Sequence, residues 1–226
     1  MRYFIFFLLI LTFKPLFGIS EKDCFFYFPD SSKPIELSHR IFSADKDLPS
    51  AQLNVKELSS LKEGDILLRK GYGWVSDRIA DLLDEKTRVT HCGLILTIGY
   101  SEPHILHTMS DHRTNGIFVE PLSAYLKQSQ QGSLVGIRLK AETDKTGAVV
   151  SESKRLLAKK IPFDLAFNDA DSTSLYCAEL FSNVFKNVFK RDLLPEKTNI
   201  YGLKAIRMRN FLNPNEFEIL FNQFEY

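Results

Sequence analysis

The 226-residue sequence has no excess of charge of either sign, no Lys/Arg-rich run, no internal repeat and no low-complexity tract. Its formal net charge is +1, and 44% of its residues are hydrophobic. Without a basic patch, the chain is not expected to bind nucleic acid. The ordinary hydrophobic fraction excludes a largely disordered chain. The length suits one domain with a sizeable core and a short accessory segment.

Cysteine is scarce, with only Cys24, Cys92 and Cys177 in the chain. They form no Cys-x-x-Cys pair, and no Cys/His spacing fits a structural zinc site. We therefore expect no metal. An odd number of cysteines leaves at least one thiol unpaired in an exported protein, which is a first indication of thiol chemistry.

Long hydrophobic runs are also missing, apart from the apolar segment Tyr3–Phe13 that follows Arg2. This segment is short for a bilayer span, which needs about 20 apolar residues. Gly18 and Ser20 provide small residues at the −3 and −1 positions of a cleavage site. The pattern predicts that residues 1–20 are a signal peptide cleaved near Ser20, and that the chain is exported to the periplasm or beyond. An uncleaved anchor or a buried strand is the alternative.

The remaining chain is expected to consist of an irregular lead-in at residues 21–60 and a domain at 61–226. Hydrophobic periodicity in the domain predicts alternating helices and strands. The expected strands are 61–69, 89–98, 105–109, 116–120 and 134–139, and the expected helices start near 76 and cover 121–126, 148–159 and the segment after 174. The last four strands are expected to form an antiparallel meander. This order of elements predicts an α+β fold.

Cys177 is the first candidate for chemistry. Ser172, Thr173 and Ser174 are good N-cap residues, so Cys177 is expected in the first turn of a helix. Unpaired backbone N–H groups and the helix dipole favour an anion there, which lowers the pKa of a thiol. The alternative is a small buried cysteine of the core.

His91 is the candidate base, because it lies in an otherwise apolar strand where an imidazole needs a polar partner. Strand alternation puts His91 on one face and Cys92 on the other. Cys92 is therefore interpreted as core packing that points away from whatever His91 serves. His107, on the neighbouring strand, could orient the His91 ring, and Glu120 on the next strand is the alternative third residue.

Taken together, four segments resemble a known family. They are Glu63-Gly64-Asp65-Ile66-Leu67, Thr90-His91-Cys92-Gly93-Leu94-Ile95, Val119-Glu120-Pro121-Leu122 and Tyr176-Cys177-Ala178-Glu179-Leu180. Their order and spacing resemble the YiiX/YebB-like proteins, the circularly permuted branch of the NlpC-type papain-fold cysteine peptidases. The resemblance covers roughly residues 60–190. Ala178 departs from it, because a serine is often found there.

The resemblance implies a permuted papain-like domain with an antiparallel sheet packed against the nucleophile helix. It implies Cys177 as nucleophile, His91 as base and His107 as the orienting residue, with Tyr176 near the oxyanion site and no cofactor. The segment Ile161-Pro162-Phe163-Asp164 would line the cleft. Asp164 would suit a substrate that carries an amino group, or else serve as a turn residue.

The function expected from these residues is hydrolysis of small peptide-type amides, possible substrates being cell-wall peptides. Two alternatives remain open at the level of the sequence. One is a lipid acyltransferase or (thio)esterase of the lecithin:retinol acyltransferase type, for which the nineteen Phe residues could furnish an acyl groove. The other is a non-catalytic envelope protein in which Cys177 only packs.

Overall fold

The computed structural model describes residues 24–26, 35–37, 48–72, 74–83, 88–110, 114–167, 173–200 and 203–224. The predicted signal peptide, residues 1–20, lies outside these ranges. The chain divides into two units, Met1–Ser43 and Ala44–Tyr226. In the first unit, β1 (Cys24–Phe26) pairs antiparallel with β2 (Ile35–Leu37). No helix in the described ranges is long and apolar enough to cross a membrane.

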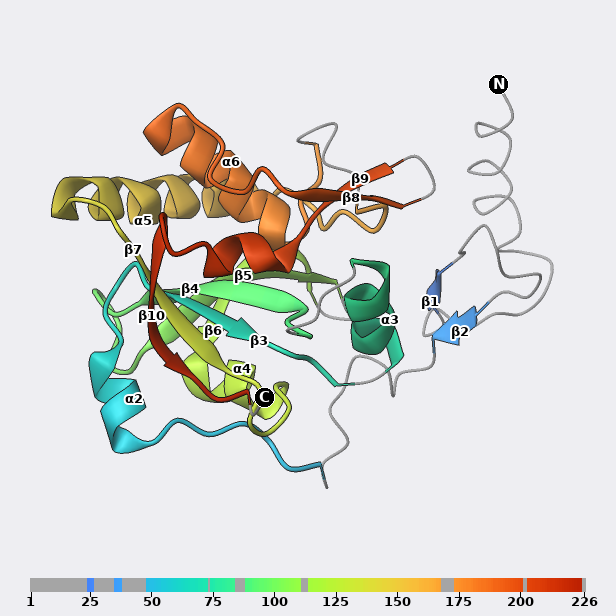
Figure 1. Ribbon diagram of the computed structural model, residues 1–226, viewed down its shortest axis with the longest axis horizontal. Coiled ribbons are helices and arrows are strands. Elements are labelled where there is room, and N and C mark those ends of the chain that lie inside the picture. Colours follow the sequence, from blue (N-terminus) through green and yellow to red (C-terminus); the bar gives the residue numbers. More distant parts are fainter. Residues whose placement is uncertain are drawn as a thin grey trace. The chain divides into compact units, whose positions relative to one another are not determined.

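The second unit is built on a six-stranded antiparallel sheet with the strand order β10-β7-β3-β4-β5-β6 (Figure 1). Its strands, in chain order, are β3 (Ile66–Arg69), β4 (His91–Leu96), β5 (His104–Ser110), β6 (Asn115–Pro121), β7 (Val135–Leu139) and β10 (Phe217–Asn222). Together with the helices it gives a mixed α+β fold with a large antiparallel sheet. The expected α+β class, with an antiparallel sheet, is confirmed.

The predicted four-strand meander is wrong in its last member. β4, β5 and β6 form a meander, but β7 pairs with β3 and β10 and not with β6. The chain turns away from β6 through α4 (Leu122–Lys127) and returns to the free edge of β3. All four residues of β3 are buried, so this edge has no solvent to satisfy its backbone groups and needs a partner strand.

Two layers of helix cover the two faces of the sheet. On one face, α5 (Thr143–Ala158), α6 (Cys177–Phe189) and the 3₁₀ helix η1 (Met208–Leu212) enclose the larger core, and α4 covers the other face (Figure 1). Residues of β4 alternate between them, with Cys92 and Leu94 in the larger core and Ile95 on the α4 side. This alternation decides which side chains can meet at the site.

The Gly64-Asp65 motif fastens β3 to β7. Both Asp65 carboxylate oxygens accept hydrogen bonds from Arg138 at 2.8 Å, and Asp65 Oδ2 also accepts the Lys62 N–H at 2.6 Å. Gly64 has φ +91°, and an added Cβ would lie 2.5 Å from Thr146 Cγ2. This segment therefore has a structural role, as a glycine-dependent turn followed by a partly buried, bidentate ion pair.

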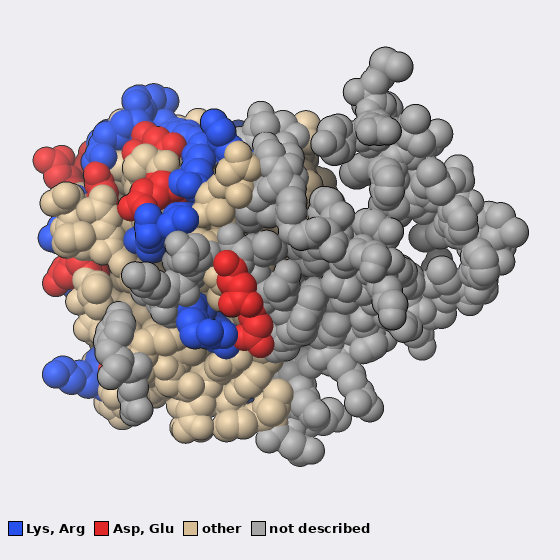
Figure 2. Space-filling model, turned by 45° about the vertical axis from the view of Figure 1, so that its right-hand side comes forward, with Lys and Arg blue, Asp and Glu red and all other residues tan. Residues whose placement is uncertain are grey.

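The lead-in is more ordered than expected. Helix α2 (Val55–Ser60) falls inside residues 21–60 and begins with a capping box in which Asn54 and Glu57 exchange hydrogen bonds. The sequence signal for it was Asn54 followed three residues later by Glu57. The remaining elements are α3 (Trp74–Leu82) and the hairpin of β8 (Lys197–Ile200) and β9 (Leu203–Ile206). On the face shown in Figure 2, basic and acidic side chains are interspersed.

Candidate active site

Three polar side chains form a hydrogen-bonded chain across neighbouring strands. His91 Nε2 lies 2.8 Å from His107 Nδ1, and His107 Nε2 lies 2.9 Å from Glu120 Oε1. They come from β4, β5 and β6, and His107 and Phe118 are partners in the β5–β6 register. The structure thus brings His91, His107 and Glu120 together. The sequence offered His107 and Glu120 as alternatives, but both take part, at successive positions of one chain of hydrogen bonds.

The chain of hydrogen bonds fixes the tautomers of both rings. A carboxylate only accepts, so His107 donates from Nε2 to Glu120. In a neutral His107, Nδ1 is then an acceptor, and His91 donates to it from Nε2. This leaves the lone pair of His91 Nδ1 free to accept a proton. Glu120 therefore acts through His107 to leave His91 Nδ1 as the accepting nitrogen of the ring.

Burial keeps both imidazoles neutral. Burial, with Arg69 and His107 nearby, holds the pKa of His91 well below the ordinary histidine value. Burial also lowers the pKa of His107, although its hydrogen bond to Glu120 acts in the opposite direction. His107 is fully buried between Phe118 and Tyr125, whose ring centroids lie 4.3 and 5.2 Å from its own.

The Thr90-His91-x-Gly93 motif has a physical explanation in this geometry. Thr90 Oγ1 lies 2.7 Å from Ser76 Oγ and accepts the Gly71 N–H, which fixes the start of β4. A Cβ on Gly93 would lie 2.6 Å from Ile105 Cγ1 and 3.3 Å from His107 Cβ. The absence of a side chain at Gly93 thus makes room for His107.

Cys177 is the first residue of α6, and Tyr176 is its N-cap. The helix starts later than the cap candidates Ser172, Thr173 and Ser174 suggested, and Tyr176 makes no side-chain capping bond. Cys177 therefore lies closer to the unpaired backbone N–H groups than expected. A hydrogen bond from Cys92, together with backbone N–H groups of Cys92 and Ala178, lowers the pKa of the Cys177 thiol despite burial.

The Cys177 thiol lies on the Cys92 side of β4. Its sulfur is 3.9 Å from the Thr90 carbonyl oxygen, and no hydrogen bond joins it to His91 in the described part of the chain. Cys92 is fully buried, as the core interpretation required. Cys92 points away from His91 as expected, but α6 packs on the Cys92 face of the sheet and brings Cys177 to it.

Tyr176 and Asp164 are both held by local structure. Tyr176 is 2% exposed, and its hydroxyl accepts the Ile206 N–H at 2.8 Å, which fastens β9 to the start of α6. Asp164 is 6% exposed, and its Oδ1 accepts the Ala166 N–H at 2.8 Å, as a turn residue does. These contacts match the turn interpretation of Asp164 and give Tyr176 a structural contact.

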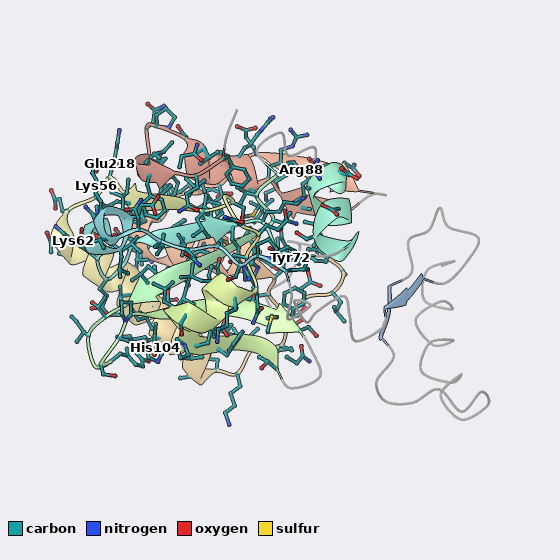
Figure 3. All side chains as sticks on the ribbon, turned by 90° about the horizontal axis from the view of Figure 1, so that it is seen from below. Lys56, Lys62, Tyr72, Arg88, His104 and Glu218 are labelled. Atoms are coloured by element: carbon teal, nitrogen blue, oxygen red, sulfur yellow. The ribbon has the colours of Figure 1, made fainter. Side chains whose placement is uncertain are left out.

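Arg69 is a polar residue of this region that the sequence did not single out. It is 5% exposed and faces His91 directly in the β3–β4 register. The only sequence signal for it was a charge ending the apolar run Ile66-Leu67-Leu68. Tyr72 and Arg88 mark this end of the sheet in Figure 3, whereas His104 lies at the opposite side of that view, stacked on Tyr100 at 4.0 Å.

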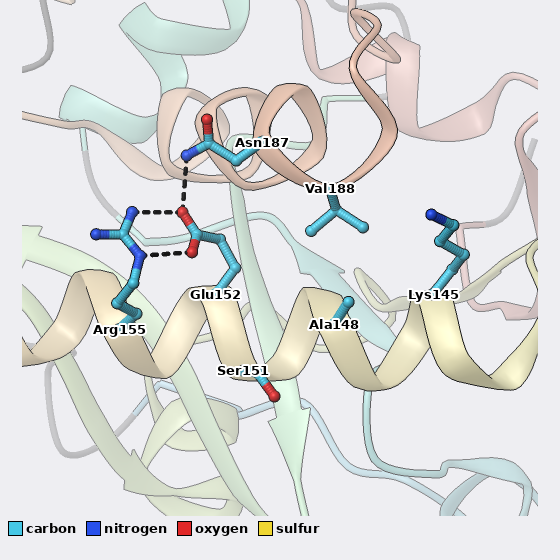
Figure 4. Close-up of a pocket in the computed structure, with 7 residues that line it drawn as sticks. All are labelled: Lys145, Ala148, Ser151, Glu152, Arg155, Asn187 and Val188. Atoms are coloured by element: carbon cyan, nitrogen blue, oxygen red, sulfur yellow. Dashed lines mark hydrogen bonds and ion pairs between the residues drawn. The ribbon is translucent and has the colours of Figure 1, made fainter.

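A separate groove of about 400 Å³ lies between α5 and α6 (Figure 4). Two of its charged side chains are engaged with each other: Arg155 pairs in bidentate fashion with Glu152, which also accepts a hydrogen bond from Asn187. None of the candidate catalytic residues lines this groove.

Comparisons with known proteins show the fold. No protein-family model matches the chain, and no curated protein matches it. Among solved structures, it is similar to the crystal structure of metalloprotein yiiX from Escherichia coli O157:H7. The TM-score is 0.59 at 14% sequence identity, over 73% of this chain and 98% of that one. The chain therefore has a YiiX-like fold.

Proposed function

We propose that the protein is a cysteine hydrolase of the permuted papain-like type, with Cys177 as nucleophile and His91 as base. The observation that carries the proposal is the chain Glu120–His107–His91, which presents His91 Nδ1 as a proton acceptor at the start of the strand that Cys177 contacts. The order of a histidine strand before a nucleophile helix also supports it, as does the YiiX-like fold.

The proposed reaction requires the Cys177 thiol, which lies on the Cys92 side of β4, to reach His91 Nδ1 past the start of that strand. Hydrogen bonds of catalytic groups are often not yet formed in the absence of substrate. His91 takes the thiol proton as sulfur attacks the substrate carbonyl, and it passes that proton to the leaving amine. Water, deprotonated by His91, then attacks the thioester, the acid leaves, and His91 returns the proton to the Cys177 sulfur. Backbone N–H groups at the start of α6 stabilise the oxyanion.

The proposal includes no metal step. The structural neighbour is named a metalloprotein, but the described residues of this chain contain no group of three or more His, Cys, Asp or Glu side chains placed to hold a metal ion. The nitrogens that join His91 to His107 and His107 to Glu120 are engaged in the hydrogen-bonded chain. These residues do not fit a metal centre.

The proposed substrate is a small amide such as a peptide, including cell-wall peptides, and the proposed location is the cell envelope or beyond. A half-buried imidazole whose pKa is held low is a good proton donor once it is protonated, which suits an amine leaving group. Export rests on residues 1–20 alone.

Incubation of the full chain with peptidoglycan fragments, short peptide amides and long-chain acyl esters tests this proposal. Mass spectrometry should show cleavage of an amide and a transient acyl group on Cys177. Cys177→Ala and His91→Ala should each abolish turnover, since the pair acts as a unit. Faster cleavage of an acyl ester than of any amide would favour lipid chemistry instead. Turnover that survives in Cys177→Ala would overturn the mechanism.

A further inference from the structure

Arg69 is a buried cation without a carboxylate partner. It is 5% exposed, and no salt bridge includes it among the described residues. Arg138, the other arginine of the central strands, is paired in bidentate fashion with Asp65. Burying an unpaired charge is energetically unfavourable. An unpaired buried cation therefore points to a function that needs its charge.

Neutral groups hold the Arg69 guanidinium in place. Its Nη1 donates to the Tyr125 carbonyl at 3.1 Å, and Nη2 donates to Gln128 Oε1 at 3.4 Å. The guanidinium carbon lies 4.2 Å from the centroid of the Tyr125 ring. Nε is buried and has no hydrogen-bond partner among the residues that the structure describes. These contacts fix the position of the charge, but none of them neutralises it.

The titratable groups around Arg69 are those of the candidate site. His91 is its partner in the β3–β4 register, and the Tyr125 ring lies 5.8 Å from the His91 ring and 5.2 Å from the His107 ring. The groups whose negative forms Arg69 attracts are Tyr125 on α4, Glu120 on β6 and Cys177 on α6. Burial raises the pKa of Tyr125 well above its usual value, so Tyr125 stays neutral.

We propose that Arg69 is the fixed positive charge of the site, a positioning residue that keeps His91 in its neutral, proton-accepting form and stabilises negative charge on the Cys177 sulfur. The inference rests on the proposed function, because it assigns Arg69 a role toward the same pair. A cation beside an imidazole disfavours a second positive charge, and a cation near a thiol favours the thiolate. The directions of the shifts at His91 and Cys177 agree with this.

The test measures the rate of iodoacetamide labelling of Cys177 against pH, by peptide mapping, in the full chain without substrate. In Arg69→Gln, labelling at pH 6 should be about tenfold slower than in the wild type and should converge with it at alkaline pH, since one nearby cation is removed. Arg69→Lys, which retains the charge, should restore most of the rate. An unchanged curve in a folded Arg69→Gln protein would overturn the proposal.

Arg138→Gln is the matched control, because it removes a cation of the same sheet that Asp65 neutralises. It should lower stability and leave the labelling curve unchanged; a shift as large as that of Arg69→Gln would count against a specific role for Arg69. If Arg69→Gln does not fold, the wild type still provides a test. Its His91 ring, followed by NMR, should stay neutral through the ordinary histidine range, and protonation within that range would refute the proposal.

These measurements need no turnover, so they are independent of the substrate assays. A wild type that cleaves no amide or ester but shows Arg69-dependent labelling would refute the hydrolase and support the role of Arg69. A wild type that cleaves a substrate, but whose Cys177 labelling rate does not depend on Arg69, would support the hydrolase and refute the role of Arg69.

Discussion

Cys177 contacts Cys92, the residue that follows the candidate base on β4. The contact arises because Cys92 and His91 face opposite sides of the sheet and α6 packs on the Cys92 side. The neighbouring Cys92 side chain lowers the pKa of the Cys177 thiol, while burial raises the pKa of Cys92 itself. Of these two thiols, Cys177 is therefore the one that ionises.

This contact predicts that Cys92→Ala slows the labelling of Cys177. Loss of one donor to the thiolate should reduce the iodoacetamide rate at neutral pH several-fold, because the thiolate fraction falls. Cys24→Ala is the control and should leave the rate unchanged. In the wild type, Cys177 should react first of the three thiols. Equal or faster labelling in Cys92→Ala would show that Cys92 does not support the thiolate.

The hydrogen-bonded chain predicts a graded loss of turnover along its length. His107→Ala removes the partner that fixes the His91 tautomer, so kcat/KM should fall about 100-fold or more. Glu120→Gln preserves an acceptor for His107 but loses its charge, so the loss should be smaller, about tenfold. Both are measured on the best substrate of the screen. Full activity in His107→Ala with none in Glu120→Gln would reverse the assigned order.

The two neutral histidines predict that acid destabilises the fold. In the unfolded chain they have ordinary pKa values, whereas burial lowers both in the folded protein. As the pH falls through the ordinary histidine range, the unfolded state binds protons that the folded state does not. The free energy of unfolding should then decrease by up to about 1.4 kcal/mol per pH unit for each histidine.

Urea unfolding at a series of pH values measures this dependence. The double variant His91→Gln and His107→Gln should have a flatter dependence between about pH 5 and 7, because its titrating groups are gone. Stability that rises toward acid in the wild type would contradict the lowered pKa of both rings.

Gly93→Ala should disturb both the sheet and the histidine chain. The added methyl group would meet Ile105 and His107, which predicts a loss of about 1–3 kcal/mol of stability by overpacking. Turnover should fall as well, because His107 is displaced. Gly147→Ala in α5 is the matched control, since no atom lies within 4 Å of its Cβ, and it should stabilise the helix by up to about 1 kcal/mol. Equal thermal midpoints for the two variants would contradict the crowding at Gly93.

Tyr176→Phe separates a structural role from an oxyanion role. Loss of the hydroxyl leaves the Ile206 N–H without its acceptor, which predicts a loss of about 1–3 kcal/mol in unfolding free energy. Turnover at a temperature where both proteins are folded should stay within about twofold of the wild type. A fall of 100-fold in kcat with normal stability would instead assign the hydroxyl to the reaction.

Local patterns in the sequence predicted the parts of the fold that depend on neighbouring residues. The strands around His91 and His107 follow from their apolar runs, and a short turn makes them adjacent, so their meeting was foreseeable. The position of Cys177 at a helix start followed from polar cap candidates, although Tyr176 turned out to be the cap.

Contacts between distant segments could not be predicted in this way. The pairing of β7 with β3 depends on a crossover, and no local pattern encodes it. Cys92 meets Cys177 only because α6 packs on that face of the sheet. Arg69 is surrounded by residues of β4, α4 and β6, which are distant from it in sequence. A charged residue at the end of a strand therefore did not indicate that it would be buried.

The pairing of β10 with β7 has a consequence for how the chain is made. Phe217 pairs with Leu139 and Asn222 with Val135, and α5, α6 and the β8–β9 hairpin are synthesised in between. Until residues 217–222 leave the ribosome, one edge of β7 has unpaired backbone groups. Helix α6 is thus complete while its supporting sheet is still open. Completion of the sheet around the site must therefore wait for residues 217–222 to be made.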